Sequence, residues 1–352
     1  MDKERSQRFM LKVVDDVGTA LAASLVHLGD RAGLFRAMAG AGPLTAQTLA
    51  DKTGIHPRYV EEWLATMVGA RYLEHDPEAD TFLLPDEHAM FLVDSESEYY
   101  LGGLLAGLPS LMTALPLLEQ AFRNGGRVAF AGYRAALPRA LESMNRSVYR
   151  SRLVRTWLPA MPEVLARLQA GGSAIDLGCG TGVVPITLAA AFPHARFAGL
   201  DLDARSIDIA RESARSEGVA GRVTFVQAPI EQLPADRPWD FISTFDVIHD
   251  LPEPDAALRA IRAALTEGGT YLMVEPKVAD RLDKNTDNPF ARMLYGISCL
   301  HCVPQSLAQG GPGLGACWGP AEARRRAREA GFSRFDQLDI RSPALAFYAL
   351  RA

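Results

Sequence analysis

The 352 residues are enough for two domains, and a hydrophobic share of 48% supplies sizeable cores. The formal net charge of -5 disfavours a protein that coats nucleic acid or an anionic membrane, so neutral or small partners fit better. The opening MDKERSQRFM is not followed by an apolar segment with a cleavage site, so we expect no secretory signal and a cytoplasmic location.

The first part of the sequence predicts a winged helix over residues 1–96. Residues 10–38 indicate a long amphipathic helix. Its apolar positions at helical spacing are Met10, Val13, Val14, Val17, Leu21, Leu25 and Leu28. Thr45 is a plausible N-cap for a second helix, and Pro57 suits the first turn of a third. The segments RYLEHD and TFLLP then flank the turn PEA as a short hairpin.

The third of these helices would be the recognition helix of a DNA-binding winged helix. Its inward positions are Val60, Trp63, Leu64 and Met67. Its polar side offers Arg58 and Arg71 against Glu61 and Glu62, so it lacks the basic face that phosphate contact requires. We therefore expect no nucleic-acid partner, and a module that pairs two subunits as a homodimer.

Residues 97–170 are predicted to be a helical linker that contributes to a substrate pocket. Within it, LGGLLAGLPSLMTALPLL (101–118) is uncharged and reaches the lower limit for a membrane span. Its glycines and its prolines, Pro109 and Pro116, suit two short buried helices better than one span, so no membrane partner is expected.

Residues 171–352 change to strands alternating with helices. The strand segments are SAIDLG, ARFAGLDLD, RVTFVQA, WDFISTFDVI, TYLMVEP, RFDQLDI and ALAFYAL, with helical stretches at 183–192, 204–217, 254–266 and 320–331. This alternation predicts an α/β fold, a Rossmann-like seven-stranded sheet with helices on both faces and a terminal hairpin. In such a sheet, ligands bind beyond the carboxyl ends of the strands.

The first strand of this sheet runs into AIDLGCGTGVVP (174–185). Glycines at alternate positions leave bare backbone where the chain must turn, so a large ligand can lie against it. The loop is not the G-x-G-x-x-G of dinucleotide folds, which cradles a pyrophosphate. The second strand ends in GLDLD, where Asp201 is placed to bind both hydroxyls of a ribose. The pattern predicts a ribose site without an evident phosphate cradle.

These residues resemble the class I S-adenosylmethionine-dependent methyltransferases over 173–351. The winged helix in front resembles the small-molecule O-methyltransferases of the plant caffeate and bacterial polyketide type. ESMNRSVY and HCVPQSLAQGGPGLGACWG look like a related bacterial group that has MNR before the first strand and an HC-P-S stretch near the end. The resemblance implies an S-adenosyl-L-methionine cofactor and a small-molecule substrate.

The resemblance also implies roles for individual residues. Gly178, Cys179 and Gly180 would lie beneath the methionine part of the cofactor. Asp176 would hold its amino group, and Leu202 would lie against adenine. Where the superfamily often has an acidic residue after the third strand, this sequence has Pro229, so adenine would rely on backbone or glutamine contacts. The expected cofactor set is Asp176, Gly178, Cys179, Gly180, Gly182, Asp201, Leu202, Ala228, Pro229, Ile230 and Phe245.

Three residues are candidates for catalysis. His249, in FDVIHDLPEPD, stands where the plant-type enzymes carry a catalytic histidine, and a neutral histidine can remove the proton of a phenol. A structural or cofactor-contact role for His249 is the alternative. Asp250 could orient it, and Glu275 at the end of MVEP is a second candidate acid or orienting group. His301 could equally be a base, and the sequence does not choose between the two histidines.

The segment 295–319 is rich in glycine near its end, which indicates either a mobile loop over substrate or a rigid insertion. It contains CLHC (299–302), and the remaining cysteines are Cys179 and Cys317. A structural zinc needs four ligands, and only His301 and the distant Cys317 could complete such a set. We therefore expect reduced thiols packed in a loop, without a metal.

The sequence as a whole predicts transfer of a methyl group from S-adenosylmethionine to a small acceptor, by O-methylation of an aromatic or polyketide-like hydroxyl with histidine as general base. Two alternatives stay open. One is N- or C-methylation of a small metabolite, and the other is a winged-helix regulator that senses the cofactor.

Overall fold

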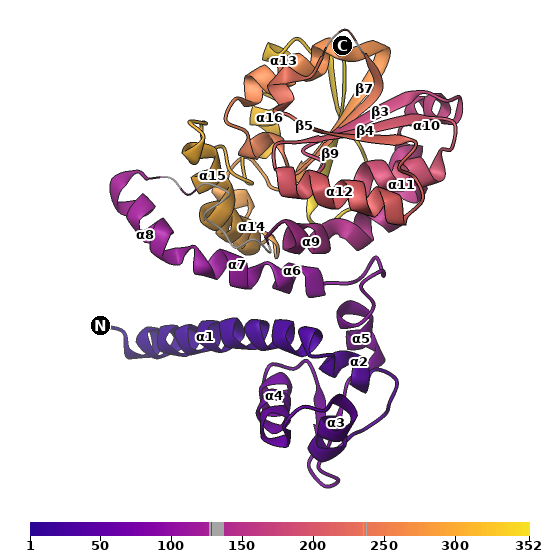
Figure 1. The fold of residues 1–352 in the computed structure, drawn as a ribbon. Helices are drawn as coiled ribbons and strands as arrows, with labels where there is room; N and C mark the ends of the chain where they lie inside the picture. Colours follow the sequence, from indigo (N-terminus) through magenta and orange to yellow (C-terminus); the bar gives the residue numbers. More distant parts are fainter. Residues whose placement is uncertain (127, 129–136, 235, 237) are drawn as a thin grey trace. The chain divides into compact units, whose positions relative to one another are not determined.

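The computed structural model describes residues 1–126, 128, 137–234, 236 and 238–352, without the side chains of 137–144. The chain divides into two compact units (Figure 1). The first combines Met1–Pro109 with Ser143–Val148, and the second combines Ser110–Glu142 with Tyr149–Ala352. Each unit is described below by itself.

The first unit begins with helix α1 (Lys3–Arg31), followed by α2 (Leu34–Met38). The single helix predicted over residues 10–38 is therefore wrong at its start, and it is broken into two helices. It begins earlier because the Asp2 carboxylate accepts a hydrogen bond from the Arg5 N–H. It breaks at Gly33, whose φ of 76° is left-handed and cannot continue an α-helix.

The winged-helix elements follow the predicted order. Helix α3 (Ala46–Thr53) has Thr45 as N-cap, with Oγ1 accepting from the Thr48 N–H at 3.1 Å. Helix α4 (Pro57–Gly69) begins at the expected proline and buries Val60, Trp63, Leu64 and Met67. Strands β1 (Glu74–Asp76) and β2 (Thr81–Leu83) pair antiparallel as the wing. The Arg58 guanidinium of α4 binds the carboxylates of its neighbours Glu61 and Glu62.

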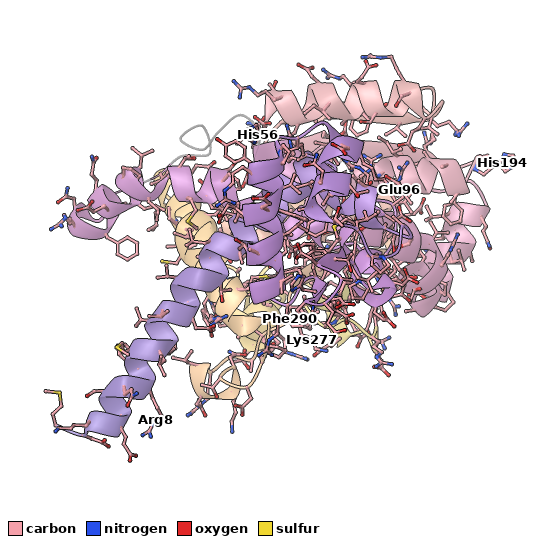
Figure 2. The ribbon with its side chains drawn as sticks, turned by 90° about the horizontal axis from the view of Figure 1, so that it is seen from below. Arg8, His56, Glu96, His194, Lys277 and Phe290 are labelled. Carbon is pink, nitrogen blue, oxygen red and sulfur yellow. The ribbon has the colours of Figure 1, made fainter. Side chains whose placement is uncertain are left out.

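Helix α1 contributes little to the core of its unit. It buries Ala22, Val26 and Gly29, where the Trp63 ring packs against the bare backbone of Gly29. Figure 2 shows the side chains around Arg8 standing clear of the rest of the first unit. Large apolar side chains are exposed along this part of the helix: Phe9, Met10, Leu11, Val13, Val14, Val17 and Leu21.

Short helices follow the wing. They are α5 (Asp86–Leu92), α6 (Gly102–Ala106), α7 (Leu108–Thr113) and α8 (Leu115–Asn124). The predicted pair of helices over 101–118 is therefore three, since the chain also breaks at Gly107. Among the described residues, no single helix meets the length and hydropathy that a membrane span requires, although Gly102–Thr113 and Leu115–Asn124 meet them as a bent pair.

Before the sheet, α9 (Leu137–Arg152) continues into a π-helix (Leu153–Trp157) and a 3-10 turn (Leu158–Ala160), and α10 (Pro162–Gln169) follows. The second unit is built on a seven-stranded sheet of order β5-β4-β3-β6-β7-β9-β8. The first five strands in chain order pair in parallel, and β9 runs antiparallel between β7 and β8. The strands are β3 (Ser173–Leu177), β4 (Arg196–Asp201), β5 (Val223–Gln227), β6 (Trp239–Phe245), β7 (Leu265–Pro276), β8 (Arg334–Gln337) and β9 (Leu345–Arg351).

The sheet and its helices confirm the predicted Rossmann-like class. Chain order reverses at β3, so right-handed crossovers place the following helices on opposite faces. Figure 1 shows α11 (Val183–Ala191) and α12 (Ala204–Ser216) together, and α13 (Pro254–Ala263) together with α16 (Gly319–Glu329). Helix α13 ends before the predicted residue 266 because β7 already begins at Leu265. The carboxyl ends of β3, β4, β6 and β7 therefore meet at one edge.

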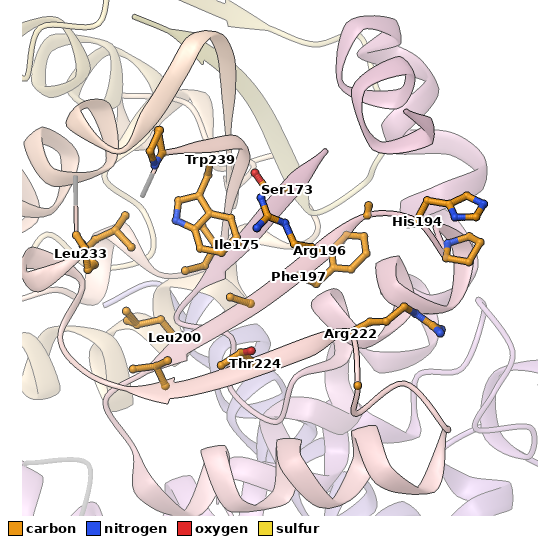
Figure 3. Close-up of a pocket in the computed structure, with 17 residues that line it drawn as sticks. Ser173, Ile175, His194, Arg196, Phe197, Leu200, Arg222, Thr224, Leu233 and Trp239 are labelled. Atoms are coloured by element: carbon orange, nitrogen blue, oxygen red, sulfur yellow. The ribbon is translucent and has the colours of Figure 1, made fainter. Parts of the chain in front are cut away.

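Between β5 and β6 the described residues form only a 3-10 turn, Ile230–Gln232. This part of the sheet carries a hollow of about 1030 Å³ (Figure 3). Its lining includes Ile175, Leu200, Thr224 and Trp239, but none of the predicted site residues. The hollow therefore lies apart from the strand ends where the candidate site is built.

Asp240 connects the starts of three strands with α10. Its carboxylate accepts from the Ser173 N–H and hydroxyl at 2.9 and 3.1 Å, from Arg167 at 3.0 Å and from Thr266 at 3.2 Å. Burial raises the pKa of this carboxyl, but the hydrogen bonds outweigh burial and lower the pKa below its usual value.

We predict that Asp240→Ala lowers the free energy of unfolding by about 2 kcal/mol at pH 7, because hydrogen bonds to a charge are lost. Urea unfolding measures this. The lowered pKa means that the contribution persists above pH ~4 and disappears as pH falls further. Asp208→Ala, which removes an exposed pair with Arg211, is the control and should change stability by less than about 0.5 kcal/mol. Equal effects of the two variants would contradict the prediction.

Candidate active site

The glycine loop joins β3 to α11 and has three left-handed residues. Gly178, Gly180 and Gly182 have φ of 68°, 51° and 84°. A Cβ on Gly178 would lie 2.6 Å from Val247, and one on Gly182 would lie 2.8 Å from Phe225. A Cβ on Gly180 would meet nothing within 4 Å. The outer glycines are therefore required by packing, and the middle one presents bare backbone to open space where a ligand fits.

Asp201 connects this loop to the end of β4. Its carboxylate accepts from the Gly180 N–H and the Asp203 N–H, both at 2.8 Å. Burial raises the pKa of Asp201, and these backbone amides oppose the rise. Each carboxylate oxygen has a second lone pair, so the group can still accept from a ribose hydroxyl pair. The neighbouring Leu202 side chain is 56% exposed, so it offers an apolar surface on which a ring can pack.

Asp176, at the end of β3, is buried with one side-chain partner among the described residues. The Ser243 hydroxyl of β6 donates to its carboxylate at 2.6 Å. Burial raises the pKa of Asp176 to about 8, with a further increase from Asp201 and a partial decrease from Ser243. An ammonium group bound beside this buried carboxyl would form an ion pair with it and favour its ionised form. Ser243 was missed by sequence reasoning, which had no signal for a cross-strand partner.

The end of β5 offers a neutral surface. The Ala228 N–H donates to the Asp201 carbonyl at 3.1 Å, and the Gln227 amide donates to the Leu202 carbonyl at 3.2 Å. Ala228 and Pro229 are half-buried, and Ile230 is buried. The structure thus brings Leu202, Ala228 and Pro229 together, without a carboxylate at the position where the superfamily often has one.

Phe245 ends β6 inside an aromatic cluster. Its ring lies 5.8 Å from Trp157 and 4.9 Å from Tyr149. The next residue, Asp246, has a left-handed φ of 56°. Burial raises the pKa of Asp246 to about 7, although His249 opposes the rise. Sequence reasoning missed Asp246, and its position directly after a buried strand was the available signal.

His249 and Glu275 form a buried pair. His249 Nδ1 lies 2.5 Å from Glu275 Oε2, and both side chains are at most 3% exposed. The other Glu275 oxygen accepts from the Ile248 N–H at 3.1 Å. Trp318 Nε1 also donates to Oε2, at 3.1 Å. Glu275 therefore holds the His249 ring in one orientation, with Nδ1 as the donor.

The second ring nitrogen of His249 faces Asp250 and Cys302. Nε2 lies 3.3 Å from Asp250 Oδ1, and ligand atoms of all three residues lie within 4.8 Å of one another. Burial lowers the pKa of His249, but Glu275 and Asp250 outweigh burial and raise it well above the usual value. Burial also raises the pKa of the Cys302 thiol to about 12. The cysteine that reaches this cluster is thus Cys302, whereas Cys299 is exposed.

His301 is the other candidate base and lies in the same turn as Cys302. The ring is buried, and burial lowers its pKa although Asp250 opposes the shift. The two histidines therefore differ electrostatically. Carboxylates favour the protonated form of His249, and burial favours the neutral form of His301.

The segment 295–319 is helical in its first half. It continues α14 (Ala291–Ile297) through a π-helix (Ser298–Cys302) into α15 (Val303–Ala308). Only the glycine-rich residues that follow are irregular, and Trp318 lies at their end. Ser298 holds these residues by accepting from the Ala316 N–H at 3.0 Å. The irregular segment thus brings Trp318 to Glu275.

Comparison with known families finds two matches in separate parts of the chain. The family described as "Methyltransferase domain" matches residues 168–311. The family described as "Rv2258c-like winged HTH domain" matches residues 19–94. These matches confirm the predicted recognition, a methyltransferase with a winged helix in front, and its enzyme class.

Curated relatives match over shorter stretches. A ubiquinone biosynthesis O-methyltransferase of Bordetella pertussis is 27% identical over 164 residues, which cover 46% of this chain and 62% of that protein. An uncharacterized Synechococcus protein is 37% identical over 98 residues, which cover 27% of this chain and 23% of that protein. The chain spans less than two thirds of the length of either relative.

Solved structures match along the whole chain. The mitomycin 7-O-methyltransferase MmcR is 20% identical, with a TM-score of 0.67 and full coverage of both chains. PigF, solved with SAH, is 20% identical with a TM-score of 0.69 and the same coverage. Human N-acetylserotonin methyltransferase, solved with SAM, is 17% identical with a TM-score of 0.66, covering 100% of this chain and 99% of that one. These similarities confirm the predicted fold.

We predict that Asp176→Asn makes the ligand-free protein more stable, relative to the native sequence, as pH rises toward 8. The raised pKa keeps Asp176 protonated in the folded state up to about pH 8, whereas the unfolded chain ionises near pH 4. Unfolding then releases a proton, so the stability of the native sequence falls as pH rises between these values. Urea unfolding from pH 5 to 8 should show a smaller fall for Asp176→Asn. Asp208→Asn is the control, and identical slopes for all three proteins would refute the prediction.

Proposed function

Because the chain belongs to the class I methyltransferases that carry a winged helix in front, we propose that it transfers a methyl group from S-adenosylmethionine to a hydroxyl oxygen of a small aromatic or polyketide-like acceptor. The observation that carries this proposal is the pair of carboxylates, buried Asp176 and half-buried Asp201, on either side of the open backbone of Gly180. Structural neighbours that are named as O-methyltransferases support oxygen as the accepting atom.

The residues at the strand ends fit the cofactor group by group. Asp176 would bind its ammonium group, Asp201 its ribose hydroxyls, and Leu202 with Pro229 the faces of adenine. The cofactor supplies a methyl group activated on a sulfonium sulfur. What remains for the protein is alignment, since holding the acceptor in line with the methyl carbon provides much of the rate.

A phenolic acceptor must also lose a proton. At pH 7 this costs about 4 kcal/mol for a group of pKa ~10, and a positioned general base contributes about 10²- to 10⁴-fold in rate. His249 and His301 are the two candidates to accept it. Glu275 would orient His249, whereas burial would keep His301 neutral and ready to accept.

The first test is calorimetric titration with S-adenosylmethionine and S-adenosylhomocysteine. We expect micromolar dissociation constants that rise about 100-fold in Asp201→Ala, because two hydrogen bonds to a charged group are lost. Asp208→Ala on α12 is the control, since its exposed carboxylate lies outside the site. Absence of binding by the native chain would remove the methyltransferase proposal.

The second test is transfer of a labelled methyl group to a panel of phenols. His249→Gln and His301→Gln are compared at saturating cofactor. Replacement of the histidine that accepts the proton should lower kcat by at least about 100-fold and leave cofactor affinity unchanged. Unchanged kcat in both variants would exclude a histidine base. If methyl transfer occurs only to amines or carbon acids, O-methylation is excluded and N- or C-methylation is the activity.

We also propose that the protein is a homodimer formed through α1. A long helix with an exposed apolar stripe is stabilised in water when that stripe is covered. A second copy presents the same stripe, so a two-fold pairing would cover both. The free cysteines are compatible with the reducing cytoplasm, which we propose as the location.

We predict that Val17→Glu converts the dimer to a monomer, because a carboxylate would be buried in the apolar interface. Sedimentation velocity at micromolar concentration measures the change. Thr19→Glu is the matched control, since the helical spacing puts residue 19 on the opposite side of α1. A monomeric native protein, or equal dissociation of both variants, would overturn the proposed interface.

A further inference from the structure

His249, Asp250 and Cys302 form a buried cluster whose three donor types are those of a transition-metal site. We propose that these three side chains bind a divalent zinc ion. The inference goes beyond methyl transfer, and it stands on the arrangement of these residues alone. With the ion in place His249 has no free nitrogen, so His301 would be the candidate base. The sequence had favoured thiols without a metal, and it had considered only the four positions of CLHC and Cys317 as ligands.

The distances suit a four-coordinate ion. Zinc binds imidazole nitrogen at about 2.0–2.1 Å and carboxylate oxygen at about 2.0–2.2 Å, so tetrahedral angles place two such ligands about 3.4 Å apart. His249 Nε2 and Asp250 Oδ1 lie 3.3 Å apart. The ligand atoms of His249, Asp250 and Cys302 all lie within 4.8 Å of one another. An ion could therefore contact all three after small side-chain adjustments.

Glu275 prepares His249 as a ligand. With Nδ1 donating to Glu275 Oε2, Nε2 points toward Asp250, and an ion would bind there in place of the Nε2 proton that the two carboxylates favour. Metal-binding histidines usually donate their other N–H to a carboxylate in this way, which fixes the ring. The Ile248 N–H and the Trp318 indole hold Glu275 in turn. The ring orientation that a metal needs is thus already built.

The charges in the cluster call for a cation. Asp250 Oδ1 is buried and has no hydrogen-bond partner of regular geometry among the described residues. It faces His249 Nε2, and these two atoms are stable at this separation only with a proton or a metal ion between them. A divalent ion would compensate the Asp250 carboxylate and a Cys302 thiolate together. Binding would release one proton from the Cys302 thiol and one from His249 Nε2.

The donor set selects the kind of metal. One imidazole, one carboxylate and one thiolate suit zinc, whereas magnesium and calcium prefer oxygen ligands only. Three protein ligands leave one tetrahedral position open, as in zinc sites that bind a water or an acceptor atom. The site would also connect the end of β6 to the π-helix Ser298–Cys302, more than fifty residues later in the chain.

The test measures metal content directly. The full chain, freed of any tag, is dialysed against chelator-treated buffer after addition of zinc chloride, and bound zinc is measured by mass spectrometry. We expect about one zinc per chain, and at least ~10-fold weaker binding in Cys302→Ser and in Asp250→Asn. Cys299→Ser is the matched control, because this exposed thiol lies three residues away outside the cluster. It should keep the zinc of the native protein.

Cobalt substitution provides a second readout that does not depend on how well the variants fold. Native protein titrated with cobalt chloride should show a thiolate-to-metal charge-transfer band. Added zinc should displace the cobalt and remove this band. Zinc far below one per chain with no such band would overturn the proposal. Equal zinc in the native, Cys302→Ser and Asp250→Asn proteins would also overturn it. Calorimetry with S-adenosylmethionine on the same samples is separate, so loss of cofactor binding would count against methyl transfer alone.

Discussion

The hydrogen bond from the Gly180 N–H to the Asp201 carboxylate fixes the geometry of the whole edge. It joins the loop after β3 to the end of β4, and it requires the left-handed backbone that glycine adopts without strain. Val247 and Phe225 then fill the space that side chains at Gly178 and Gly182 would need. The Asp201 carboxylate, Val247 and Phe225 therefore fix the loop, whose backbone forms the ligand surface.

Burial of several acids at this one edge is the second constraint. Asp176, Asp201, Asp246 and Glu275 all follow or end parallel strands, and burial raises the pKa of the first three. Buried carboxylates without partners are costly, so an edge of this kind is stable with protons or cations in place. The ammonium of a cofactor would neutralise the side nearest β3, and a metal ion would compensate the Asp250 carboxylate in the turn that follows β6. Two different ligands would thus satisfy one electrostatic requirement.

Much of this fold could be predicted from the sequence, because its periodicity is local. The alternation of strands and helices after residue 173, the N-cap at Thr45, the proline that begins α4 and the buried face of α4 all follow from neighbouring residues. The break at Gly33 was missed, and the two short helices predicted over 101–118 are three, since an isolated glycine does not by itself indicate where a helix ends. The positions of Asp176, Gly180 and Asp201 could be inferred because strand ends of a parallel sheet share an edge.

The partners of these residues could not be inferred in the same way. Cys302 reaches His249 only because α14 continues through a π-helix turn, which shifts the register of the following side chains. Trp318 reaches Glu275 at the end of an irregular segment whose path depends on the hydrogen bond from the Ala316 N–H to Ser298. Such contacts depend on backbone geometry that no spacing rule describes. The residue types were visible in the sequence, but their meeting around one histidine is a property of the fold.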